Sequence, residues 1–218
     1  MSDTIKVDHY HPTEERWNIL SHAFGFALSL IAFGLLVTKA AVYNNIWTSV
    51  IVGVFGLSLI ILYGASTLYH YARTAIIRSR LQVLDHAAIY ILIAGTYTPF
   101  TLLTLNSATG WLIFTASWSM AFVGVILKFF FTGKYDLLST LMYVFMGWII
   151  VFAIKPLIAS ISYAGLMWLV AGGVSYTLGA VLYSIEKLHF NHAIFHIFVL
   201  LGSFCHFIAV YYYVLIGA

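Results

Sequence analysis

Long apolar runs alternate with short polar breaks along almost the whole chain, and this alternation is the dominant pattern in the sequence. Each run has close to the roughly 20 residues that a helix needs to cross the hydrocarbon layer of a bilayer. The runs lack the period-two alternation that marks the roughly ten-residue strands of a membrane β-barrel. The pattern therefore predicts an all-α fold, a seven-transmembrane-helix bundle. The expected spans cover residues 19–42, 47–70, 85–105, 110–131, 136–154, 162–183 and 192–216.

The composition of the chain excludes an ordinary water-soluble protein. Of the 218 residues, 62% are hydrophobic and only 8% are charged, whereas soluble domains carry roughly 25% charged residues. We expect a polar cytoplasmic segment over residues 1–18 and a single transmembrane domain over residues 19–218. The single cysteine, Cys205, excludes an intrachain disulfide and a cysteine-based zinc site. No feature of the sequence suggests nucleic-acid binding.

The distribution of Lys and Arg predicts the orientation of the bundle. Seven spans place the two termini on opposite sides, and cytoplasmic loops carry the excess of basic residues. With the N-terminus inside, eight basic residues lie on the inner segments, and only Lys39 and Lys155 lie on the outer ones. We therefore predict a cytoplasmic N-terminus and a C-terminus on the outside. The first apolar run is too long for the core of a signal peptide, so we expect no cleaved signal.

Ionisable side chains gather at the predicted inner ends of three spans. His70 ends the second run and Asp85 opens the third, while His192 and His196 open the seventh. An even number of spans separates His70 from His192, which returns the chain to the same face of the membrane. Ser66 and His70 are four residues apart, as are the two later histidines, so each pair shares one helix face. Ionisable groups at a bilayer boundary are costly and indicate a functional site.

Three histidines in this arrangement predict a metal centre. Three imidazoles with one open position are a common ligand set for zinc, and a histidine pair at i and i+4 can bind one ion. We therefore expect His70, His192 and His196 to hold Zn²⁺. Asp85 is a candidate catalytic residue that orients a water, accepts its proton or holds a ligand imidazole. Ser66 is a candidate donor to Asp85, to the water or to a substrate carbonyl.

A simpler explanation exists for part of this pattern. Histidines at a membrane interface often only form hydrogen bonds or contact head groups, so one H-x-x-x-H pair is weak support for a metal site. The S-x-x-x-H pair and the aspartate are predicted to lie at the same depth in the membrane as the H-x-x-x-H pair. This agreement favours a metal site.

Four motifs resemble those of one membrane-protein family. Residues 14–25 read EERWNILSHAFG and look like the pattern E-E-x-x-N-x-x-[ST]-H-x-x-G. Residues 66–70, STLYH, look like S-x-x-x-H, and residues 192–196, HAIFH, look like a closing H-x-x-x-H. The block LDHAAIYILIAGTYTPF over residues 84–100 is similar to the third helix of the same proteins. Over essentially its whole length the chain resembles bacterial hemolysin III proteins, which belong to the progestin and adipoQ receptor superfamily.

The resemblance carries expectations of its own. It implies a zinc ion held by His70, His192 and His196, with Asp85 contacting the zinc through water and Ser66 nearby. Some eukaryotic members of the superfamily are linked to hydrolysis of ceramide, and bacterial members to haemolysis and membrane-lipid homeostasis. The resemblance also implies a multi-pass protein of the bacterial inner membrane.

Glu15, Asn18 and His22 are candidates for a second polar layer beside the metal. Helix capping and interfacial anchoring explain these residues about equally well, and the motif match favours a role in the site.

Two other histidines are not expected to be ligands. His86 follows Asp85 but points about 100° away on a helix, so we expect it to face the interface. His206 lies fourteen residues after His192, about 21 Å deeper by helical rise, which excludes it from the same coordination shell. We expect a buried, hydrogen-bonded histidine there, with a second polar cavity as the alternative.

These observations favour a zinc-dependent hydrolase that acts on the amide or ester of a membrane lipid. The alternatives are a non-catalytic, zinc-stabilised lipid sensor or receptor, and a membrane-lytic protein. Ion-coupled transporters usually carry charges deep in their spans, and such charges are essentially absent here. The last span contains no lysine, which excludes a retinal pigment.

Overall fold

The computed structural model describes residues 10–43, 45–185 and 187–215, and over these residues every regular element is a helix. Seven helices in the described ranges are long and apolar enough to cross a membrane, which confirms the predicted fold class. In chain order the elements are α1 (Pro12–Tyr43), α2 (Ile46–Tyr71), α3 (Ala75–Pro99), η1 (Phe100–Leu105), α4 (Ala108–Phe131), α5 (Asp136–Trp148), η2 (Ile149–Ala153), α6 (Ile154–Ser160), α7 (Tyr163–Tyr183), α8 (Asn191–Ala209) and η3 (Val210–Val214).

Short polar residues in the predicted breaks begin several of these helices. The side-chain oxygen of Asn45 accepts a hydrogen bond from the Thr48 backbone N–H at 2.9 Å and begins α2. Ser107 and Ser162 begin α4 and α7 in the same way. Each cap satisfies a backbone donor that the first turn of a helix leaves free. The breaks in the apolar pattern are therefore sites where the chain reverses and a new helix starts.

Two helices begin earlier than the apolar runs predict. α1 begins at Pro12 rather than at residue 19, and α3 begins at Ala75 rather than at residue 85. The first turns of α3 contain Arg78, whose guanidinium pairs with the Glu15 carboxylate of α1. The first turns of α3 are therefore polar and paired with α1, so the helix extends beyond the apolar run. Asp85 consequently lies almost three turns inside α3 and not at its start.

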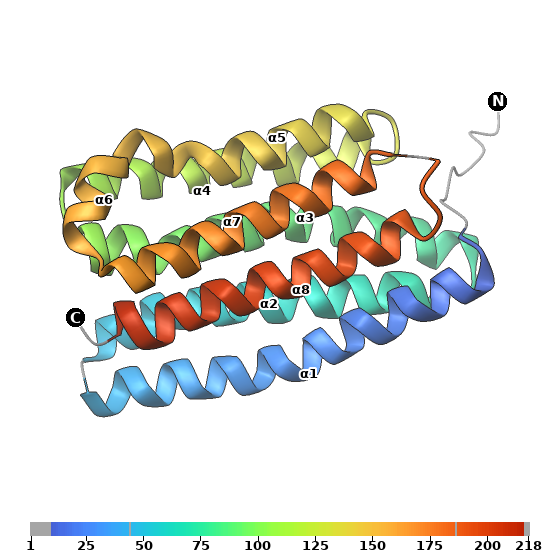
Figure 1. The fold of residues 1–218 in the computed structure, drawn as a ribbon. Helices are drawn as coiled ribbons and strands as arrows, with labels where there is room; N and C mark the ends of the chain where they lie inside the picture. The colour runs from blue at the N-terminus through green and yellow to red at the C-terminus, as the bar shows by residue number, and fades with distance from the viewer. Residues whose placement is uncertain (1–9, 44, 186, 216–218) are drawn as a thin grey trace.

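The bundle is built from an N-terminal and a C-terminal group of helices. α1 packs along α2, α2 along α3, and α7 along α8, while α8 also contacts α1. Figure 1 shows the starts of α1 and α8 at the same end of the bundle, together with the end of α2. α2 and α3 are the most buried spans, and the span formed by α5, η2 and α6 is the least buried. The topology therefore brings the histidines of α2 and α8 to one end.

Pro99 marks the point at which α3 changes into the wider π-helix η1. Proline lacks the N–H of a regular helical turn, and its ring crowds the preceding turn. The π-helix ends at Asn106, which adopts the left-handed conformation with φ of 34°. Pro99 therefore changes the type of helix at the following residue without ending the span.

Candidate metal centre

The three predicted ligand histidines converge at one end of the bundle. His70 comes from α2, and His192 and His196 come from the first turns of α8. One ligand atom from each residue lies within 4.8 Å of the others, so the cluster could hold a metal ion. The Nε2 atoms of His70 and His192 are 3.1 Å apart, and all three side chains are buried. The predicted meeting of the second and seventh spans is thereby confirmed.

The start of α8 is fixed by a contact with the end of α7. Asn191 is the first residue of α8, and its side-chain amide donates a hydrogen bond to the Tyr183 carbonyl at 2.9 Å. Phe190, immediately before it, adopts the left-handed conformation with φ of 60°, which is uncommon for a bulky residue. This sharp turn aims the first turn of α8, and with it His192, toward α2.

A separate partner engages the Nδ1 atom of every one of these imidazoles. Glu15 Oε2 lies 2.9 Å from His70 Nδ1, and Tyr10 Oη lies 3.0 Å from His192 Nδ1. His196 Nδ1 lies 3.2 Å from Ser21 Oγ and 3.3 Å from the Asn18 carbonyl oxygen. All four partners belong to α1 or to the residues just before it. The N-terminal part of the chain therefore orients the whole ligand set.

These partners decide which ring nitrogens remain for a metal. The ionised Glu15 carboxylate and the Asn18 carbonyl only accept hydrogen bonds, so His70 and His196 carry their protons on Nδ1. Their Nε2 atoms then carry no proton, and each offers a lone pair that can bind a metal. Metal-bound histidines usually donate the other ring N–H to a carboxylate or a carbonyl in this way.

The spacing of the nitrogens also suits the zinc that the sequence predicts. Ligands about 2.0–2.1 Å from a tetrahedral ion lie roughly 3.3 Å apart, close to the 3.1 Å between the Nε2 atoms of His70 and His192. At this pair of nitrogens the residues present fit a tetrahedral ion, and the three histidines together could hold a metal.

Glu15 connects three helices at this site. One carboxylate oxygen meets His70 on α2, and the other meets the guanidinium of Arg78 on α3. Arg78 also donates to the His70 and Ala72 carbonyls, at 3.5 and 3.4 Å, at the end of α2. Glu15 was expected in a second polar layer, and the structure places it directly against a candidate ligand.

The other two residues of that predicted layer also lie at the site. Asn18 is fully buried, and its amide donates to Glu15 at 3.3 Å. The ring of His22 stacks on His196, with centroids 3.4 Å apart and planes 9° apart. Neither nitrogen of His22 has a hydrogen-bond partner among the described residues. His22 therefore presents an imidazole with unused hydrogen-bonding groups next to a candidate ligand.

Asp85 and Ser66 lie in the wall of a cavity that reaches the histidines. Both residues are buried. The Asp85 carboxylate lies outside the group of three converging nitrogens. The Ser66 hydroxyl is near Asp85 but falls short of hydrogen-bond geometry with any described residue.

Sequence reasoning missed three contributors and misplaced one residue. Tyr10 and Arg78 lie in polar stretches whose spacing gives no hint of a contact with the site, and Ser21 was noted only as part of a motif. His86 was expected at the interface, yet it lines the cavity. Its backbone carbonyl accepts a hydrogen bond from Tyr143 of α5 at 2.9 Å. The prediction that His86 faces the interface was wrong because α5 packs over the face of α3 that carries His86.

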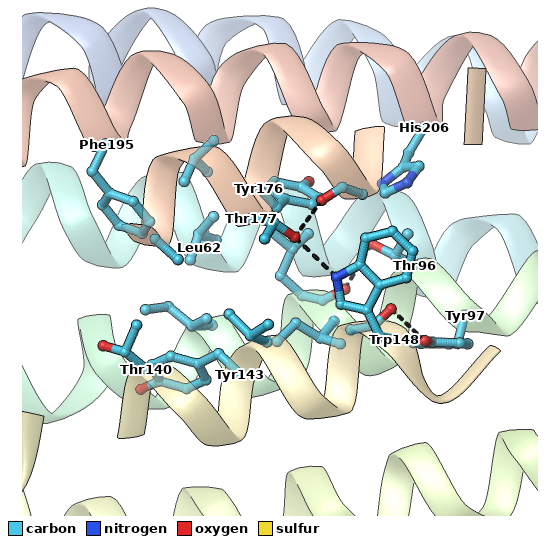
Figure 2. Close-up of a pocket in the computed structure, with 18 of the residues that line it drawn as sticks. Leu62, Thr96, Tyr97, Thr140, Tyr143, Trp148, Tyr176, Thr177, Phe195 and His206 are labelled. Carbon is cyan, nitrogen blue, oxygen red and sulfur yellow. Dashed lines mark hydrogen bonds between the residues drawn. The ribbon is translucent and has the colours of Figure 1, made fainter. Parts of the chain in front are cut away.

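The cavity itself is long and mostly apolar. It has a volume of about 210 Å³, with His192 and His196 at one end and His206 in its lining further along α8. Fourteen residues of helix separate His192 from His206, which corresponds to roughly 21 Å. Apolar and aromatic side chains from α2, α3, α5 and α7 line the space between them, as Figure 2 shows for Leu62 and Tyr143. This shape suits a long apolar chain whose polar end reaches the histidines.

Comparison with known proteins gives consistent matches over nearly the whole chain. The family model described as "Haemolysin-III related" matches residues 10–207. The "Hemolysin-3 homolog" of Bacillus subtilis is 42% identical over 92% of this chain and 94% of its own length. "Hemolysin-3" of Bacillus cereus is 43% identical over 93% of this chain and 92% of its own length. The human "Monocyte to macrophage differentiation factor" is 29% identical, covering 94% of this chain and 87% of its own length.

Proposed function

This chain belongs to the haemolysin III family, and we propose that it is a zinc-dependent hydrolase of a membrane-lipid amide or ester in a bacterial inner membrane. One observation carries the proposal. Three buried imidazoles converge, and two of them, His192 and His196, line a long apolar cavity that also contains the buried Asp85 carboxylate. Catalytic sites commonly combine an apolar pocket with a few convergent polar groups.

The protein residues divide the work of the proposed reaction. His70, His192 and His196 would hold the zinc, which when bound polarises a carbonyl and activates water. Tyr10, Glu15 and the Asn18 carbonyl keep the imidazole rings in place.

Two buried groups would act on the reactants. Asp85 accepts the proton of the attacking water as general base, and later returns it to the leaving amine or alcohol. Ser66 has a buried hydroxyl without a hydrogen bond to the described residues, and it donates to the substrate carbonyl. The cavity holds the acyl chain and excludes bulk water from the reacting bond. The predicted orientation places this end of the bundle at the cytoplasmic face.

Substitution of Asp85 by Asn tests the catalytic role. Asn keeps the shape of the side chain but cannot accept the proton, so turnover of a labelled lipid amide or ester should fall at least 100-fold. Zinc content, measured by metal analysis of the purified protein, should stay at the wild-type level.

His192→Ala is the companion variant, and it should lose both zinc and turnover. Chelation followed by zinc restoration should abolish and then recover turnover in the wild type. Wild-type turnover in Asp85→Asn would refute Asp85 as the general base, and turnover indifferent to chelator would refute the dependence on zinc. No turnover by the zinc-loaded wild type would refute hydrolysis.

A structural metal in a lipid sensor or receptor is the second candidate. The contacts of Glu15 with His70 and Arg78 favour it, because they tie α1, α2 and α3 together at the metal centre. A sensor predicts that zinc content stays at the wild-type level in Asp85→Asn and that neither the wild type nor the variant converts the lipid. The same pair of measurements therefore separates the two functions.

A further inference from the structure

A second polar cluster lines the cavity far from the metal centre, around His206 of α8. The side chain is 5% exposed and lines the same cavity, and Figure 2 shows it projecting from α8 toward α7 and the cavity. Its Nε2 lies 3.2 Å from the Leu169 carbonyl oxygen of α7. The ring packs beside Tyr176, with centroids 5.3 Å apart. Gly172 makes room for it, since a Cβ there would lie 2.5 Å from Nε2.

The hydrogen bond to α7 decides what the other ring nitrogen offers. A carbonyl oxygen can only accept, so Nε2 of His206 carries a proton. A charged side chain this deep in a bilayer is costly, so the neutral ring is the relevant form and Nδ1 is an acceptor. This Nδ1 is buried and has no hydrogen-bond partner among the described residues. A buried acceptor without a donor destabilises the protein, and a donor on a ligand would remove that cost.

A hydroxyl network holds the neighbouring wall of this subsite. Tyr63 of α2 donates to Ser203 Oγ at 2.7 Å, and Ser203 Oγ lies 2.9 Å from Tyr176 Oη. The network joins α2, α7 and α8 and fixes the Tyr176 ring against His206. Rigid positioning of this kind lets one polar group discriminate between ligands that differ by one hydroxyl.

The distance between the two polar ends of the cavity sets the position of the donor on a ligand. Ten residues of α8 separate His196 from His206, which is roughly 15 Å of helical rise. An extended chain advances roughly 1.2 Å for each bond, as an extended peptide does. About twelve bonds therefore separate a head group at the histidines from a group at His206.

We propose that the cavity binds a long-chain acyl lipid that carries a hydroxyl group about twelve carbons from its head, and that His206 Nδ1 accepts the hydrogen bond of that hydroxyl. The proposal rests on lipid occupancy of the cavity, which the proposed function requires, but not on hydrolysis. It makes His206 a specificity-determining residue at a site distinct from the metal centre.

The test compares three fatty acids of equal length on the full-length, zinc-loaded protein in detergent micelles. The probes are octadecanoic, 2-hydroxyoctadecanoic and 12-hydroxyoctadecanoic acid, each measured by displacement of a fluorescent fatty acid. The 12-hydroxy acid should bind about tenfold more tightly than the other two, as expected for one well-formed hydrogen bond. His206→Phe should remove this preference while leaving the affinity for octadecanoic acid unchanged. His189→Phe, the same exchange at an exposed loop position, should keep it.

The outcomes separate this inference from the proposed function. Equal affinity of the wild type for all three acids overturns the His206 subsite alone, and it is also the result expected if only water satisfies Nδ1. A preference that survives in His206→Phe, or disappears in His189→Phe, overturns it as well. If no fatty acid displaces the fluorescent probe, both the subsite and the lipid cavity are refuted. Should His206→Phe fail to fold, the wild-type comparison of the 2-hydroxy and 12-hydroxy acids still decides.

Discussion

At the metal centre each imidazole uses its two nitrogens for different purposes. Nδ1 of His70 is engaged by Glu15, and Nδ1 of His192 by Tyr10, while the Nε2 atoms face one another. A second contact of this kind fixes both the rotation of the ring and the position of its proton. The affinity for a metal therefore depends on residues that never touch it.

Glu15→Gln is the sharpest test of this dependence. Glutamine keeps the size of the side chain but removes the charge that favours the proton on His70 Nδ1 and pairs with Arg78. Zinc affinity, measured by competition with a chromophoric chelator, should fall about 10–100-fold.

Glu14→Gln is the matched control for that measurement. The Glu14 carboxylate accepts a hydrogen bond from the backbone N–H of His192 at 3.3 Å, a role that an amide oxygen can also fill. The zinc affinity of Glu14→Gln should stay within about twofold of the wild type, a change smaller than the free energy of one hydrogen bond. Equal losses in the two variants would show that the effect comes from net charge and not from contact with the ring.

At the scale of the helices, α2 and α3 approach closely at a single glycine. A Cβ on Gly95 would lie 2.3 Å from Ser58 Oγ and 2.6 Å from Ser58 Cβ. Small residues at such crossings let membrane helices pack tightly. This contact sets the distance between the helix that carries His70 and the helix that carries Asp85.

Gly95→Ala should therefore destabilise the bundle by about 1–3 kcal/mol through overpacking. The measurement is thermal unfolding in detergent, followed by intrinsic fluorescence. Gly34→Ala on α1 is the control, because no heavy atom lies within 4 Å of a Cβ at that position. The double variant Gly95→Ala with Ser58→Gly should recover part of the loss. A neutral Gly95→Ala would contradict the close approach.

At the scale of the whole molecule, the metal centre joins segments from both ends of the chain. Tyr10 and α1 contact the histidines of α2 and α8, so the first and last spans meet at one cluster. The C-terminal helices α7 and α8 also pack against each other. A metal at this point binds only the assembled bundle, because the unfolded chain does not bring the three rings together.

Removing the metal should therefore lower the unfolding temperature. At a zinc concentration about 100 times its Kd, binding contributes about 2.7 kcal/mol, which corresponds to roughly 5–10 °C for a protein of this size. Thermal scans with zinc and with excess chelator would measure the difference. His196→Ala should show almost no difference between the two conditions. An equal shift in that variant would place the stabilising ion elsewhere.

Much of this architecture could be anticipated from local features of the chain. The apolar runs predicted seven spans because a bilayer forces every spanning segment to satisfy its own backbone as a helix. The even number of spans between His70 and His192, with the i and i+4 spacing of His192 and His196, correctly predicted a shared site. The orientation of the termini, inferred from Lys and Arg, stays a prediction.

The apolar runs misplaced the start of α3. They could not include Ala75 because the turn around Arg78 is polar, and its pairing with Glu15 of another helix leaves no mark in the local pattern.

The sequence by itself determined the class of the protein, the number of its spans and the residues that could bind a metal, because periodicity and composition are local properties. Only the tertiary structure decided that Tyr10 and Glu15 orient the ligand rings, that His86 faces the cavity and that His206 lines the same cavity. Those contacts join residues from 55 to 182 positions apart or depend on how neighbouring helices pack. No local pattern encodes them, since they exist only once the helices have found their partners.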